Sequence, residues 1–224
     1  MVRSIAIKPY VDTMLRPQVE GIGNVISLTT PAVFVANHSS HLDTPLIVGA
    51  LPSRFGSRLA VGAAADYFFA SRLTGATTAL LFNAFPVRRG AAPEALSTAK
   101  CLLASGWSVL LYPEGTRSGD GNLGNFKTGA ARLSLETGLP VLPIAVSGTQ
   151  YVIPRGKRLP ARAQRPLSVR FGPPMSPATG ETPQILRNRM RENMQQLRGE
   201  SGASSQPLGQ VGGENQVVTD RMRE

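Results

Sequence analysis

The chain has 224 residues and a formal net charge of +10 at pH 7. Its one cysteine and two histidines exclude an internal disulfide framework and argue against a structural zinc site, which usually needs four such ligands. Only four of the 24 basic residues are lysine, and an arginine excess suits anionic partners: a phosphorylated substrate, an anionic membrane or a nucleic acid. No apolar run of about 18 residues occurs, so we expect neither a membrane-spanning helix nor an N-terminal secretion signal.

Apolar periodicity, prolines and glycines divide the chain into short strands and helices. The first 20 residues mix apolar and basic positions, and an amphipathic helix there would either pack on the core, which we favour, or lie on a membrane. In chain order the pattern predicts helix 10–16, strands 22–28 and 32–36, helix 44–50, strand 58–62, helix 64–73, strand 85–87, helix 93–105, strand 107–111, helix 126–136, strands 141–146 and 167–171, and helix 182–198.

Strands that alternate with helices predict a three-layer α/β domain, in which helices flank a central mixed, mostly parallel sheet. We divide the chain into an N-terminal amphipathic segment (1–20), the domain itself (21–198) and a Gly-, Ser- and Gln-rich tail (199–224) that we expect to be disordered. A basic loop at 155–165 separates the last two strands. The residues with recognisable chemistry follow strands, at the edge where such sheets bind ligands.

The stretch Asn-His-Ser-Ser-His-Leu-Asp at 37–43 lies between a strand and a helix. His38 and Asp43 are five residues apart, and an imidazole beside a carboxylate is a general base for a hydroxyl proton. A second interpretation is structural, with Ser40 capping the helix and Asp43 completing a capping box. Backbone N–H groups at this helix start are candidate donors to an oxyanion. His41 lies too near Asp43 in sequence to suit the pairing, and we expect it to be a partly exposed neighbour.

Three more sequence blocks follow in order: Phe-Pro-Val-Arg-Arg at 85–89, Pro-Glu-Gly-Thr-Arg at 113–117, and Leu-Pro-Val-Leu-Pro-Ile-Ala-Val at 139–146. With His-x-x-x-x-Asp before them, these blocks resemble the glycerolipid acyltransferase family, whose best-known members are 1-acylglycerol-3-phosphate acyltransferases. The resemblance covers roughly residues 20–175. It implies transfer of a fatty acyl group from acyl-CoA or acyl carrier protein to a hydroxyl of lysophosphatidic acid, which gives phosphatidic acid in phospholipid biosynthesis.

The resemblance also implies the roles of the two catalytic residues. His38 takes the proton of the acceptor hydroxyl, and Asp43 orients and polarises His38. The thioester is already activated, so no covalent acyl-enzyme, metal or cofactor is needed. The absence of a Gly-x-Ser-x-Gly elbow likewise argues against a serine hydrolase.

A second set of residues would bind the substrate phosphate. The resemblance assigns this role to Arg117, whose guanidinium can grip two phosphate oxygens, and matches Arg89 to the family's second arginine. Taken alone, Arg89 is better explained as a solvated surface charge. We expect Glu114 to orient an arginine, or otherwise to contact the glycerol hydroxyl. Gly115 would let the backbone approach the ligand, and Thr116 belongs to the same block.

Several alternatives to this function stay open. The acceptor could be glycerol 3-phosphate or another lysolipid, and a non-catalytic protein that binds anionic lipid is a third class. Nucleic-acid binding is not supported, because the sequence shows no helix-turn-helix, RNA-binding aromatic motif or zinc finger. The basic loop is more simply a surface for a membrane, for CoA phosphates or for an acidic carrier protein. We therefore expect a cytoplasmic enzyme that lies peripherally on the inner face of the cell membrane.

Overall fold

A computed structural model describes residues 7–65, 76, 79–87, 92–118, 122–152 and 166–199. Several sequence predictions lie outside these residues. They are most of the helix expected at 64–73, Arg89, the basic loop 155–165, and all of the tail after its first residue.

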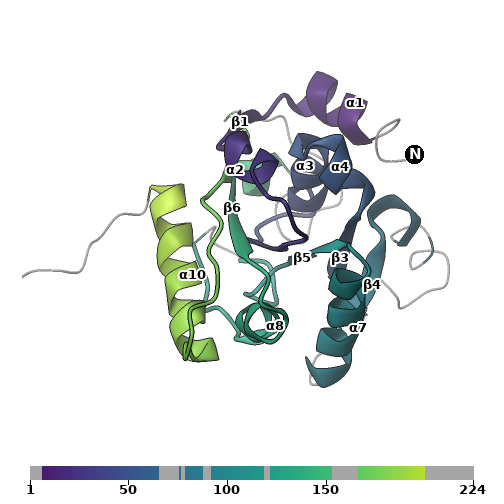
Figure 1. The fold of residues 1–224 in the computed structure, drawn as a ribbon. Coiled ribbons are helices and arrows are strands. Elements are labelled where there is room, and N and C mark those ends of the chain that lie inside the picture. The colour runs from purple at the N-terminus through teal and green to yellow at the C-terminus, as the bar shows by residue number, and fades with distance from the viewer. Residues whose placement is uncertain are drawn as a thin grey trace, which may run out of the picture.

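One seven-stranded sheet, in the order β1-β7-β6-β2-β5-β3-β4, forms the centre of the described part of the chain (Figure 1). Its strands are β1 (Gln18–Glu20), β2 (Val33–Ala36), β3 (Leu59–Ala64), β4 (Ala84–Val87), β5 (Ser108–Leu111), β6 (Val141–Ser147) and β7 (Ser168–Phe171). Neighbouring strands run parallel except for the antiparallel pair β6 and β7. The predicted mixed, mostly parallel sheet is confirmed.

Helices cover both faces of this sheet, with α1 to α4 on one side and α7, α8 and α10 on the other (Figure 1). The helices are α1 (Lys8–Tyr10), the π-helix η2 (Val11–Leu15), α2 (Ile22–Ile26), α3 (Asp43–Ala50), α4 (Ser53–Ser57), α7 (Ala92–Ala104), α8 (Gly129–Thr137), α9 (Thr149–Val152) and α10 (Pro183–Arg198). The predicted three-layer arrangement is therefore confirmed. No helix among the described residues is long and apolar enough to cross a membrane.

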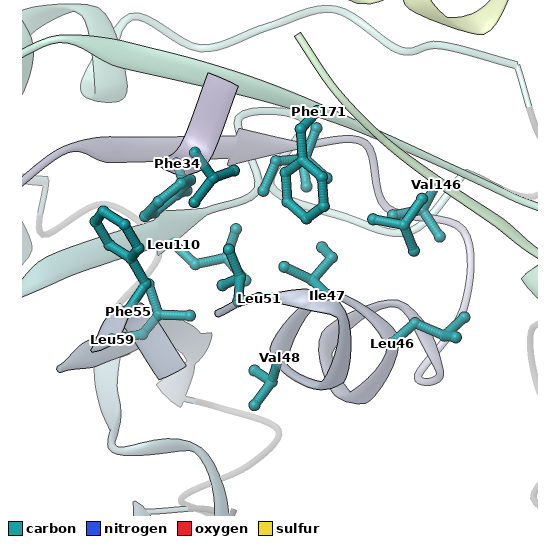
Figure 2. Close-up of a cluster of buried hydrophobic side chains, with 14 of the residues drawn as sticks. Phe34, Leu46, Ile47, Val48, Leu51, Phe55, Leu59, Leu110, Val146 and Phe171 are labelled. Atoms are coloured by element: carbon teal, nitrogen blue, oxygen red, sulfur yellow. The ribbon is translucent and has the colours of Figure 1, made fainter. Parts of the chain in front are cut away.

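Strand β2 is buried on both faces, as its unbroken apolar sequence predicts. Phe34 packs with Ile47 of α3 in the cluster that Figure 2 shows. Val33 and Val35 point to the opposite face, where they join Met190 of α10. Burial of each such side chain stabilises the fold by about 1.5–3 kcal/mol. Strand β2 is therefore rigidly placed, and so is the start of the segment that follows it.

The prediction of a strand at 22–28 is wrong, because this stretch contains helix α2. Gly21 has a φ of +70°, and a Cβ there would collide with the carbonyl oxygen of Phe171, so the chain turns sharply after β1. Val25 and Leu28 are buried three residues apart, which is a helical spacing rather than the alternation of a strand.

The N-terminal segment 1–20, where it is described, belongs to the same body as the domain. Its last residues form β1, which pairs with β7 at the edge of the sheet. Val11 is fully buried, and a Cβ on Gly49 of α3 would lie 2.8 Å from it. Packing on the core is therefore confirmed, while Tyr10 and Met14 on the same segment are exposed.

Candidate active site

The edge of the sheet where the central parallel strands end carries the residues of two sequence blocks. His38 follows β2 and Glu114 follows β5, and these strands are direct neighbours. Asn37 joins β2 to β6 on the other side. Its side-chain amide donates to the carbonyl of Val146 (2.9 Å), and its Oδ1 accepts the Val146 N–H (2.8 Å). The carboxyl ends of three strands are thus held together around His38.

The side chains of His38 and Asp43 form a close pair, with Nδ1 of the imidazole 2.8 Å from Oδ2 of the carboxylate. Asp43 is fully buried and the His38 side chain is 17% exposed. Since the carboxylate also accepts backbone N–H groups, it is the acceptor and His38 Nδ1 carries the proton. Nε2 of the neutral ring is then the basic atom, which suits a general base.

The capping-box interpretation and the catalytic one are compatible in the structure. Oδ2 of Asp43 accepts the N–H of Ser40 (2.9 Å), as in a capping box, and also the N–H of Ser39 (2.7 Å). If Ser40 were the N-cap, helix α3 would begin at residue 41. The helix begins instead at Asp43. These two N–H groups are therefore committed to Asp43, and the sequence-based suggestion that N–H groups here bind an oxyanion does not hold for them.

The aromatic ring of Tyr112 packs against one face of the His38 imidazole. Its ring stacks on that of His38, with centroids 4.2 Å apart and planes inclined by 25°. Its hydroxyl lies 2.7 Å from Oγ1 of Thr44. Burial, followed by the nearby Asp43 carboxylate, raises the pKa of Tyr112, so that it stays a neutral phenol. His38 is thus held by a carboxylate at one nitrogen and by an aromatic ring on one face.

Glu114 contacts the backbone, whereas the sequence predicts a partner arginine or a substrate hydroxyl. Oε1 accepts the N–H of His38 and Oε2 accepts the N–H of Gly124, each at 2.9 Å. Burial raises the pKa of Glu114, although these two N–H groups act in the opposite direction. Glu114 therefore joins the end of β2 to the segment before α8 and fixes the backbone of His38.

Replacing Glu114 with glutamine tests this link. One N–H would then face an amide NH₂ instead of an oxygen, which leaves a donor without an acceptor and destabilises the fold by about 1–2 kcal/mol. We expect a lower midpoint in urea unfolding and a lower kcat. Glu94→Gln, at an exposed position of α7, is the matched control and should change neither. Equal unfolding midpoints for Glu114→Gln and the parent protein would contradict the role.

The Glu-Gly-Thr-Arg block forms a loop next to His38. The N–H of Ser118 donates to the carbonyl of His38 at 2.8 Å, which connects the end of the loop to the His38 backbone. Gly115 has a φ of +73°, and a Cβ there would lie 2.7 Å from Nζ of Lys127, so only glycine lets the ammonium group lie against the loop. Gly115 and Thr116 are exposed and Arg117 is half-buried.

His41 differs from His38 in its electrostatic environment. Burial, followed by the positive charge of Arg117, lowers the pKa of His41 to about 4. It is therefore neutral at neutral pH, and the Arg117 guanidinium lies close enough to act on it. Among the described residues, no group of three or more His, Cys, Asp and Glu side chains is arranged to hold a metal ion.

Thr149 is a site residue that the sequence analysis did not find. It is fully buried at the start of α9, and its Oγ1 lies 2.5 Å from Oδ1 of Asp43. The available signal was the polar run Ser147-Gly148-Thr149 directly after an apolar strand, at the edge where ligands bind. No motif spacing links this run to the His-x-x-x-x-Asp block.

Comparison with known proteins agrees with this geometry. A family model described as Acyltransferase matches residues 16–147, which is more than half of the chain. The chain belongs to the glycerolipid acyltransferase family. All of the site described above except Thr149 lies inside the matched range.

Named relatives support the same family. The chain is 34% identical over 157 residues to the chloroplast 1-acyl-sn-glycerol-3-phosphate acyltransferase of Arabidopsis thaliana, covering 68% of this chain and 41% of that protein. It is 32% identical over 179 residues to human 1-acyl-sn-glycerol-3-phosphate acyltransferase alpha, covering 73% of this chain and 57% of that protein. Among solved structures, the 1-acyl-sn-glycerophosphate acyltransferase of Thermotoga maritima superposes with a TM-score of 0.68 at 26% identity, over 90% of this chain and 82% of that chain.

The family members differ from this chain in length. It spans about two fifths of the plant chloroplast relatives that it matches. The family match therefore establishes an acyltransferase domain.

Proposed function

We propose that the protein transfers a fatty acyl group from a thioester to the free hydroxyl of lysophosphatidic acid, giving phosphatidic acid. The observation that carries the proposal is the buried Asp43 carboxylate 2.8 Å from Nδ1 of a partly exposed His38. A neutral imidazole fixed in this way presents Nε2 to a hydroxyl proton. The relatives named above, which are 1-acylglycerol-3-phosphate acyltransferases, support the choice of acceptor.

The reaction then proceeds in one addition and one elimination. Nε2 of His38 takes the proton as the acceptor oxygen attacks the thioester carbonyl, and Asp43 stabilises the imidazolium that forms. When the tetrahedral intermediate collapses, the C–S bond breaks and the leaving thiolate takes the proton back from His38. The donor is acyl-CoA or acyl carrier protein, as a co-substrate, and no further cofactor enters the scheme.

The cations on the loop next to His38 are proposed to hold the acceptor phosphate. Arg117 supplies a planar guanidinium and Lys127 an exposed ammonium group that lies over Gly115. Arg89, which lies outside the described residues, is proposed from the sequence block alone as a third cation. A phosphate pinned on one side of His38 would bring the glycerol hydroxyl of the same molecule to Nε2.

A panel of acceptors tests the proposed reaction. Purified protein is offered acyl-CoA or acyl carrier protein together with lysophosphatidic acid, glycerol 3-phosphate, lysophosphatidylcholine or monoacylglycerol, and the products are read by mass spectrometry. We expect phosphatidic acid from lysophosphatidic acid as the main product. A preference for glycerol 3-phosphate or for another lysolipid would show that this compound, and not lysophosphatidic acid, is the acceptor. Binding to anionic vesicles without any release of thiol would show that the protein binds lipid and does not transfer acyl groups.

A lipid acceptor also requires contact with a membrane, and we propose that the N-terminal segment provides it. Tyr10, Met14 and Val19 are 47%, 74% and 41% exposed. Lys8 and Arg16 are exposed on the same segment, where Nζ of Lys8 also lies 3.1 Å from Oδ2 of the exposed Asp12. Apolar side chains among basic ones suit the interface of an anionic membrane, and the cytoplasmic inner face of the cell membrane is the location that we propose.

Polar substitution of this exposed patch should weaken membrane binding. Tyr10→Ser together with Met14→Ser removes two apolar side chains from the interface, and we expect about tenfold weaker partitioning onto anionic vesicles. Sedimentation with vesicles that contain or lack anionic lipid measures the effect. Ile185→Ser, at a 52% exposed position of α10 across the sheet, is the control. Equal losses in both variants would show that the N-terminal segment has no special part in binding.

A further inference from the structure

The second oxygen of the Asp43 carboxylate has a partner of its own. Oδ2 accepts from the imidazole and from the N–H groups of Ser39 and Ser40. Oδ1 faces the opposite way, toward α9, and lies 2.5 Å from Oγ1 of Thr149. Asp43 and Thr149 are fully buried, so this contact is shielded from water.

The direction of the hydrogen bonds follows from the donors available. A carboxylate that already accepts two backbone N–H groups is ionised and only accepts, so the Thr149 hydroxyl donates to it. A hydroxyl has one proton, and Oγ of Ser39 lies 3.2 Å from the same Thr149 oxygen. Ser39 is therefore the donor in that contact, and two hydroxyls form a chain from Ser39 through Thr149 to Asp43.

The position of Thr149 is fixed by the backbone around it. Gly148 has a φ of +89°, and a Cβ there would lie 2.6 Å from the carbonyl oxygen of Pro166, so the turn between β6 and α9 requires glycine. The paired hydrogen bonds between Asn37 and Val146 hold β6 in register with β2. The hydroxyl thus reaches Asp43 from an element that is rigidly placed relative to it.

We propose that Thr149 is a positioning residue of the acyl transfer, which by its bond to Oδ1 fixes the plane of the Asp43 carboxylate and takes up part of its negative charge. The inference rests on the function proposed above. A carboxylate that loses this donor turns more freely, so His38 is less well aimed. The carboxylate also carries more charge toward the imidazole, which favours the protonated ring.

Two other titratable side chains beside the imidazole, Tyr112 and Glu114, are held by contacts that do not involve Thr149. Tyr112 stacks on the ring from the end of β5, and Glu114 binds the His38 backbone. His41 and Arg117 lie in the two neighbouring loops, and the charge of Arg117 acts on His41. An altered pH profile after substitution of Thr149 alone is therefore assigned to the bond with Asp43.

Kinetics of three variants test the proposal. Thr149→Val keeps the shape and removes the donor, and we expect kcat to fall about tenfold, with little change in the acceptor KM, because loss of an outer partner misorients the catalytic group. The acid limb of the pH profile should move to higher pH. Thr149→Ser should restore most of kcat. Thr98→Val, at an exposed position of α7, should behave as the parent protein.

A substrate-free measurement separates this proposal from the proposed reaction. The ring protons of His38, followed by NMR against pH, should titrate at a higher midpoint in Thr149→Val than in the parent protein, whether or not an acceptor has been found. If Thr149→Val does not fold, Ser39→Ala provides a second test, because it removes the hydroxyl that donates to Thr149. The titration midpoint of His38 should then also rise, by a smaller amount. An unchanged midpoint and unchanged kcat in the folded variants would overturn the role of Thr149.

Discussion

Replacing His38 with alanine should abolish acyl transfer, lowering kcat by about a thousandfold or more, since general acid–base catalysis contributes about 10²–10⁴-fold. The expected loss lies near the upper end of that range because the same imidazole takes the proton from the acceptor and returns it to the leaving thiol. Binding of the acceptor should change little, since the proposed phosphate contacts come from other residues. The measurement is thiol release from acyl-CoA in the presence of lysophosphatidic acid.

The second histidine supplies the control for this experiment. His41→Gln should keep most of the parent rate, because the Asp43 carboxylate is bonded to His38 and burial with nearby positive charge keeps His41 neutral. The fold should survive His38→Ala, whose side chain is 17% exposed, and thermal unfolding checks this. A His38→Ala variant that folds and turns over at the parent rate would remove the general base from the proposal.

The pairing of His38 with Asp43 was predictable because its geometry is local. The six residues (37–42) that connect a buried strand to a helix leave few ways to arrange His38 and Asp43, and the apolar sequence of β2 already indicates the strand. Helix α2 was mispredicted for a related reason. Its apolar residues are few and fit a strand as well as a helix, and the turn at Gly21 depends on the distant carbonyl of Phe171.

The supporting contacts could not be predicted, because they join residues far apart in the chain. Thr149 meets Asp43 across 106 positions, and Glu114 meets the N–H of His38 across 76. Both contacts depend on strands β5 and β6 lying on either side of β2, which is a property of the sheet order. A sequence block identifies the residue, such as Glu114, but the order of the strands decides which group that residue contacts. Glu114 shows this most clearly, since its block was recognised and its partner was not.

These contacts share one mechanical consequence. His38 is held at Nδ1, on one ring face and at its backbone N–H and carbonyl by residues that follow two neighbouring strands, β2 and β5. Each element is fixed by the buried sheet, so the imidazole needs no rearrangement to act as the general base that we propose. Preorganisation of this kind lowers the barrier because the orienting groups are already in place when charge develops.

Replacing Arg117 with alanine should chiefly weaken the binding of a phosphorylated acceptor. A charge-assisted hydrogen bond contributes about 1.5–3 kcal/mol, so we expect KM for lysophosphatidic acid to rise about 10- to 100-fold while kcat changes by a few fold. Arg117→Lys keeps the charge and loses the planar guanidinium. Its KM for lysophosphatidic acid should lie between the values of the parent protein and of Arg117→Ala. Arg132→Ala, at an exposed position of α8, should match the parent protein.

Two further measurements show whether the lost interaction is with phosphate. Monoacylglycerol, which lacks the phosphate, should be used equally poorly by the parent protein and by Arg117→Ala. The charge of Arg117 also helps to lower the pKa of His41 to about 4, so its removal should raise that pKa toward the ordinary value of 6.5, which NMR can follow. If KM for lysophosphatidic acid stays unchanged while the pKa of His41 rises, Arg117 acts on the neighbouring histidine and another cation binds the phosphate. Lys127, whose ammonium group lies over the same loop, would then be the residue to replace.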